Sequence, residues 1–202
     1  MKKLFSVVLL LSLPIIAAED VTETTPQRLG FAVGLSSAPM SVGFRIPIAD
    51  HYSVDLALHI PEYISTKTDA AEMSGMELGG LVGYSFPLRL EENIAFVLRP
   101  QLDVSLLTMS GKSSPAPDSN EIEQTNLDIM PGVFAGVEVF MEEVGIPNMN
   151  LLLGFTAGMV FESSTYSYYS QGKMNDVKSH SFRGPLLGEA PFGATVSIFW
   201  YF

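Results

Sequence analysis

Eleven charged residues of this 202-residue chain stand at alternating positions that place them on one face of successive strands. Charges inside a protein must pair with opposite charges or be hydrated, so this face can form an internal network of salt bridges. The alternative is a narrow, water-filled path that prefers cations, because the carboxylates outnumber the arginines. We expect the network, which comprises Arg28, Arg45, Asp55, Glu77, Arg99, Asp103, Asp128, Glu138, Glu162, Arg183 and Glu189.

The histidines give little sign of catalysis. His180 lies between Ser179 and Ser181, a set that would suit a hydrolase in which histidine activates serine. Adjacent residues of a strand point to opposite faces, so we interpret His180 as a hydrophilic loop residue. The sequence has no cysteine, no cluster with metal-ligand spacing and no phosphate-binding glycine loop. We therefore expect no enzyme activity, no cofactor and no metal ion.

The charged face belongs to eight segments in which apolar residues alternate with small or polar ones. Their polar face holds mostly glycine, serine and alanine, whereas a solvated strand face would carry many Lys, Glu and Thr. This favours an all-β fold, an eight-stranded antiparallel up-and-down transmembrane β-barrel, over a soluble lipocalin-like barrel. Pro100 and Pro131 lack a ladder donor, so we expect a bulge or local break at each. The segments are 28–36, 40–46, 53–60, 75–86, 94–106, 126–139, 151–162 and 192–202, the last beginning as early as Phe182.

The connections between these segments alternate in length, which indicates their polarity across a membrane. The short ones fit periplasmic turns, and the long, polar ones fit external loops. The connection 36–39 is an exception, because it should be external and yet is short. The short connections are 47–51, 87–93 and 141–149, and the long ones are 62–74, 108–121 and 163–179.

The long loops are the candidate sites for a surface ligand. The loop that begins at Ser163 is rich in tyrosine and serine, which suit an adaptable binding surface. The other interpretation, which we prefer, assigns Tyr166, Tyr168 and Tyr169 to the external aromatic girdle of the barrel.

The first residues have the pattern of an export signal. Residues 1–18 combine a basic start, an apolar run and a small pair at Ala17 and Ala18, as in a cleavable signal peptide. Residues 19–27 lack periodicity and are interpreted as a flexible periplasmic tail, so the barrel domain is 28–202. The formal net charge of −11 argues against a nucleic-acid partner.

The last strand ends in an aromatic cluster. Phe202, with Trp200 beside it, resembles the carboxy-terminal signal that the barrel-assembly machinery reads in bacterial outer-membrane proteins. From residue 28 onward, the alternation and loop pattern resemble the small bacterial outer-membrane β-barrel family, similar to the transmembrane domain of outer membrane protein A.

This resemblance implies a location in the outer membrane of a Gram-negative bacterium, with outer-membrane lipid as surroundings and the assembly machinery as a partner during biogenesis. It implies a non-enzymatic protein with a structural or surface-interaction role. The alternative is a narrow cation-preferring pore or small-molecule passage channel, and a lipid-modifying outer-membrane enzyme is less favoured. We expect no periplasmic domain after the last strand, and the oligomeric state stays open.

Overall fold

The computed structural model describes residues 28–36, 40–49, 52–68, 71–91, 93–113, 121–170, 173–184 and 192–202. The predicted signal peptide 1–18, the tail 19–27 and Glu189 lie outside these residues, so those expectations stay predictions. Among the described residues, no helix has the length and apolar character needed to cross a membrane.

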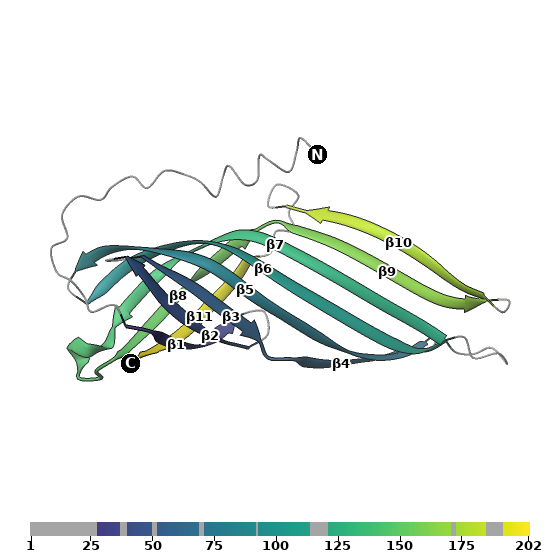
Figure 1. The fold of residues 1–202 in the computed structure, drawn as a ribbon, viewed down its shortest axis with the longest axis horizontal. Coiled ribbons are helices and arrows are strands. Elements are labelled where there is room, and N and C mark those ends of the chain that lie inside the picture. Colours follow the sequence, from purple (N-terminus) through teal and green to yellow (C-terminus); the bar gives the residue numbers. More distant parts are fainter. Residues whose placement is uncertain are drawn as a thin grey trace.

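The fold is an antiparallel sheet of eleven strands and one short 3-10 helix (Figure 1). The elements are β1 (Gly30–Ser36), β2 (Ser41–Ala49), β3 (Tyr52–His59), β4 (Glu62–Lys67), β5 (Ala71–Glu91), β6 (Ile94–Ser113), β7 (Glu121–Phe140), η1 (Met141–Val144), β8 (Met149–Gly158), β9 (Val160–Ser170), β10 (Lys173–Arg183) and β11 (Phe192–Tyr201).

Eight of these strands close into a ring. The hydrogen-bonded order is β7-β6-β5-β3-β2-β1-β11-β8, and β8 pairs with β7 again. Every one of the eight alternating segments contributes to this ring, so the antiparallel all-β prediction is confirmed. The prediction that the last strand begins as early as Phe182 is wrong. Phe182 belongs to the separate strand β10, and the last strand, β11, begins at Phe192.

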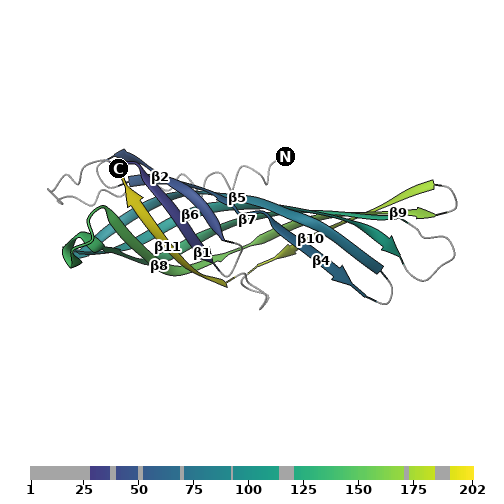
Figure 2. The same cartoon turned by 90° about the horizontal axis from the view of Figure 1, so that it is seen from below.

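A second part of the sheet projects from one end of the ring (Figures 1 and 2). There β4 pairs with the first part of β5, β9 pairs with β7, and β10 pairs with β9. We call this region the extension. It consists of β4, β9 and β10 together with the parts of β5, β6 and β7 that continue beyond the ring.

The extension corrects the prediction of long loops. Residues 62–67, 163–170 and 173–179 lie in strands, and β6 runs on to Ser113. Residues 114–120 and 171–172 lie outside the described part. Both faces of these strands carry polar residues, so the sequence lacks the hydrophobic alternation by which a strand is recognised. These strands are nevertheless held by backbone pairing, β4 with β5, β9 with β7 and β10 with β9.

The two strand prolines lie at interruptions of the ladder, as predicted. On one side of Pro100, Gly83 pairs with Gln101, and the next pair is Phe86 with Leu98. Pro131 lies opposite the interval between β8 and β9, where the amide of Met159 donates to the Pro131 carbonyl at 3.0 Å. The missing proline N–H accounts for both local breaks.

The apolar residues of the ring point outward. Leu58 and Phe155 are each 69% exposed, whereas Phe134, on the opposite parity, is 0% exposed. A soluble barrel would bury the apolar set instead, so the predicted direction is confirmed. The interior also contains an apolar cluster that the sequence did not predict, formed by Val97, Phe134, Leu152 and Phe199.

Candidate functional site

The charged network inside the ring is built on a directly opposed pair. Arg45 of β2 and Asp55 of β3 are register partners on adjacent strands, and both are buried. The Arg45 Nε lies 2.8 Å from Asp55 Oδ1, and Nη2 lies 3.0 Å from Oδ2. This bidentate geometry is the strongest form of arginine–carboxylate pairing.

Arg45 also reaches across the ring. Its Nη1 lies 2.8 Å from Oε1 of Glu138 on β7, which is four strands from β2 in either direction around the ring. Asn150 donates to the same Oε1 at 2.8 Å, and the Tyr201 hydroxyl lies 3.3 Å from it. The Arg45–Glu138 contact therefore spans the interior.

Asp55 is shared with a second arginine. The Arg99 Nη1 donates to Asp55 Oδ2 at 3.0 Å, and the Ser85 hydroxyl donates to the same oxygen at 2.7 Å. Arg99 Nε donates to Gln101 Oε1 at 3.0 Å. Two arginines and two carboxylates are thus connected in one buried group. Their opposite charges offset the cost of removing each of them from water. We call Arg45, Asp55, Arg99 and Glu138 the plug.

Aromatic rings and glycines complete the plug. The Arg45 guanidinium lies 3.9 Å from the centroid of the Phe199 ring, and the Arg99 guanidinium lies 4.7 Å from that of Phe134. A Cβ atom at Gly83 would come within 2.7 Å of Arg99 Cδ. The interior of an eight-stranded ring is narrow, so at the level of the plug the arginine and aromatic side chains leave space only for glycine beneath them.

A histidine and a carboxylate lie close together apart from the plug. His59, the last residue of β3, places its Nε2 3.4 Å from Oδ2 of Asp103 on β6. The imidazole lies over Gly79 of the intervening strand, since a Cβ atom there would come within 2.5 Å of Nδ1. The alternation in the sequence placed Asp103 on the inner face and did not pair it with His59.

A cavity of about 280 Å³ separates these two groups of charges. Asp55, Arg99 and Gln101 line it on the plug side, and His59 and Asp103 line it as well. Most of its other lining residues on the inner face are glycine, alanine, serine and threonine. The interior can therefore hold a small molecule in this cavity, while the plug obstructs a path through the ring beyond it.

Several predicted members of the network lie elsewhere. Arg28 precedes β1 and hydrogen-bonds to the exposed Asn148 in the turn after η1. Glu162 and Arg183 pair at 3.3 Å in β9 and β10, with 47% of the arginine side chain exposed. These three residues lie outside the plug, because Arg28 precedes β1 and because Glu162 and Arg183 lie on β9 and β10 of the extension. Glu162 shares the face of its register partner Asp128.

The remaining predicted residues are placed as follows. Glu77 and Asp128 are half-buried and lie on the inner face of β5 and β7. The terminal aromatics point outward, with Trp200 41% and Phe202 79% exposed, and their role as an assembly signal stays a prediction. Among the described residues, no three His, Asp or Glu side chains are grouped to hold a metal ion.

No protein-family model and no curated protein matches this sequence. Solved structures of bacterial outer-membrane proteins are similar to it at low identity. A major outer membrane protein of Thermus thermophilus has a TM-score of 0.43 and 10% identity, covering 87% of this chain and 98% of that chain. Acinetobacter baumannii CarO has a TM-score of 0.39 and 11% identity, with coverage of 90% and 100%. Ail, the attachment invasion locus protein of Yersinia pestis, has a TM-score of 0.34 and 13% identity, with coverage of 86% and 95%.

Proposed function

We propose that the protein is an integral outer-membrane protein whose ring of eight strands is a transmembrane β-barrel, with a non-enzymatic structural or surface-interaction role. The observation that carries this proposal is a hydrogen-bonded ring whose outer surface is apolar. In lipid every backbone polar group must be satisfied internally, and a closed barrel meets this requirement because its sheet has no free edge.

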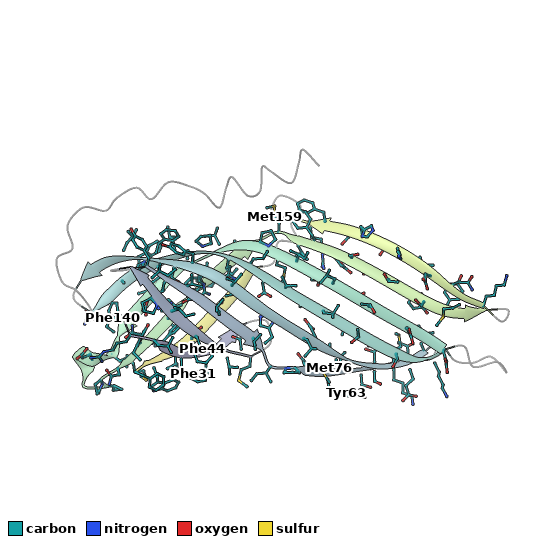
Figure 3. The ribbon with its side chains drawn as sticks, in the orientation of Figure 1. Phe31, Phe44, Tyr63, Met76, Phe140 and Met159 are labelled. Atoms are coloured by element: carbon teal, nitrogen blue, oxygen red, sulfur yellow. The ribbon has the colours of Figure 1, made fainter. Side chains whose placement is uncertain are left out.

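Aromatic residues at the short-turn end support the proposal. Tyr52, Tyr84 and Phe86 form a cluster, with ring centroids 4.6 Å apart for Tyr84 and Phe86. Phe31 and Phe44, labelled in Figure 3, make an edge contact at 5.7 Å on the neighbouring outer surface. Such rings suit the girdle at a membrane interface.

The apolar band ends where the extension begins. Leu78, Leu106 and Leu127 are register partners on the outer face, and one row further out Thr108 pairs with Thr125. Beyond that row the same face carries mostly serine and charged residues. The extension would therefore stand in water and provide the surface-interaction role.

The tyrosines of the extension fit a binding surface better than a girdle. Tyr166 pairs with Gln124 and Tyr168 pairs with Ile122, on the face that continues the ring interior. Ile122 is only 5% exposed, which places it beneath its neighbours on this concave side. A girdle needs outward rings, so we infer a binding role for Tyr166 and Tyr168 in place of the girdle. The side chain of Tyr169 lies outside the described part, and its assignment to the girdle stays a prediction.

A narrow cation-preferring pore is the second candidate, and the interior cavity favours it. The plug opposes a continuous path, because Arg45 binds Glu138 across the ring. A lipid-modifying enzyme has less support. Ser181 donates to Glu162 at 3.0 Å, and His180 is the register partner of Ser163, so the two adjacent side chains point to opposite faces.

The membrane assignment is tested with Trp200, the only tryptophan of the chain. The full chain without residues 1–18 is refolded into vesicles that contain lipids with brominated acyl chains. Because Trp200 points outward, we expect bromolipid to quench its fluorescence and aqueous iodide to have little effect.

Neighbouring positions supply the control. In a Trp200→Phe background, Phe155→Trp should be quenched by bromolipid, whereas Thr156→Trp should not, because Phe155 points outward and Thr156 lines the cavity. Iodide quenching of Trp200 and Phe155→Trp, without bromolipid quenching, would show that the ring does not lie in lipid.

A further inference from the structure

We infer that the cavity above the plug binds a small organic cation, such as a primary amine, through Asp103 and His59. This inference rests on the proposed membrane barrel, because the barrel wall encloses the cavity. It adds a specific ligand class and a specific pair of residues to the structural role of the interior.

The cavity has the size and walls of a small-molecule site. Its volume of about 280 Å³ is close to the lower end of ligand pockets, which span roughly 300–1,000 Å³. Small residues keep it open, because none of them can reach across the interior. They include Ala32, Gly34, Gly43, Ala57, Gly132 and Gly158.

The plug gives the floor of the cavity no net charge. Arg45 and Arg99 are matched by Asp55 and Glu138, and each of these charges has an ion-pair partner within 3.0 Å. The charge preference of the cavity must therefore come from its wall. There, Asp103 is the remaining charged residue among those that line the cavity, with His59 beside it.

The His59–Asp103 pair is incompletely satisfied by the residues that the structure describes. Its Nε2–Oδ2 distance of 3.4 Å exceeds the usual range for an N–H···O bond. The other nitrogen, His59 Nδ1, and the other oxygen, Asp103 Oδ1, have no hydrogen-bond partner, and only 8% of the His59 side chain is exposed. Unpaired buried polar groups are costly, so a cationic N–H donor in the cavity would supply a missing partner.

Carboxylates continue from the cavity towards the extension. Asp128 is the register partner of Ser105, which in turn pairs with Gly79, the residue beneath His59. The Asp128 Oδ1 is also buried without a hydrogen-bond partner in the described structure. This negative approach favours a cation over an anion. An organic cation fits better than a metal ion, because no three ligating side chains are grouped among the described residues.

The test uses three probes of similar size: n-propylammonium, n-propanol and propionate. They are titrated into the refolded full-length mature chain in detergent micelles at low ionic strength, and the His59 ring signals are followed by NMR. With only three histidines in the chain, comparison with His59→Gln assigns these signals. We expect saturable shifts with propylammonium and no saturable shift with the alcohol or the carboxylate.

Two variants and one control locate the site. Asp103→Asn should weaken propylammonium binding at least tenfold, and Ala57→Leu should weaken it by filling the cavity. Asp176→Asn makes the same change in net charge on the exposed strand β10 and should leave binding unchanged. Equal binding of all three probes, or unchanged binding in both Asp103→Asn and Ala57→Leu, would overturn the inference. Normal Trp200 quenching by bromolipid, after the same protein is refolded into vesicles of brominated lipid, would show that the membrane barrel itself still stands.

Discussion

Arg45 and Glu138 form an ion pair with a 2.8 Å contact, although their strands lie on opposite sides of the ring. Both side chains are nearly inaccessible to solvent, with 7% and 4% exposed. The contact ties two distant parts of the wall together and occupies the interior between them. It therefore has consequences for both stability and permeability.

Replacing Arg45 by Ala should strongly destabilise the protein. Asp55 and Glu138 would each lose a buried positive partner, and breaking a buried pair costs about 3–5 kcal/mol. Urea unfolding from lipid vesicles measures the loss. The control is Lys67→Ala, whose pair with Glu72 is mostly exposed and should contribute about 0–1 kcal/mol. Equal losses in the two variants would mean that the Arg45 network does not hold the ring.

Replacing Arg99 by Ala should raise conductance. In the unmodified protein we expect a small, cation-preferring conductance, because the plug obstructs the interior at one level and carboxylates dominate the approach to it. The variant removes a side chain that lines the cavity and releases one contact of Asp55. Planar-bilayer recording of both proteins checks this. A large anion-selective conductance in the unmodified protein would contradict the assignment of the interior.

Gly83→Ala should destabilise the protein by about 1–3 kcal/mol through overpacking. The new Cβ would lie 2.7 Å from Arg99 Cδ and 2.8 Å from its Cγ, so Arg99 would have to move away from Asp55. In the Arg99→Ala background this clash is absent, and the cost of Gly83→Ala should fall close to zero. A double-mutant cycle by urea unfolding measures the coupling, and additive costs would argue against this packing.

Leu153→Arg and Leu56→Arg should impair folding into lipid. Both leucines face outward, with 40% and 41% exposed, and a lipid-facing arginine near the midplane costs roughly 2–4 kcal/mol. Ala57→Ser is the control, because Ala57 lines the cavity, and it should be tolerated. The yield of refolded protein in vesicles checks the difference. Similar tolerance on both faces would point to a protein that folds in water.

The mature chain should begin near Glu19 and fractionate with the outer membrane. The basic start, apolar run and small residues before Glu19 fit a cleavable signal. Amino-terminal sequencing of the protein from separated membranes checks both points. Recovery of an uncleaved protein in the inner membrane would refute them.

The sequence by itself determined the ring strands and their outward face. Alternation has a period of two, which depends only on the local backbone, so residues such as Leu56 and Ala57 could be assigned to opposite faces. The ladder breaks at Pro100 and Pro131 could also be predicted, because the missing N–H donor is a property of proline itself. The added strands β4, β9 and β10 escaped this reasoning because they are mostly polar on both faces and are held by pairing with β5, β7 and β9, respectively.

Only the tertiary structure decided which inward charges meet. Arg45 and Glu138 are 93 residues apart in sequence, and closure of the ring brings them together, whereas Arg183 and Glu162 pair in the extension. Alternation assigns a side chain to a face but does not give its height along the axis of the ring or its partner across the interior. Phe134 shows the same limit, because it is an aromatic residue at an inward position among small and polar ones. In the fold its ring fills the space above Gly136 of the same strand and Gly154 of β8, where a Cβ atom would meet the ring.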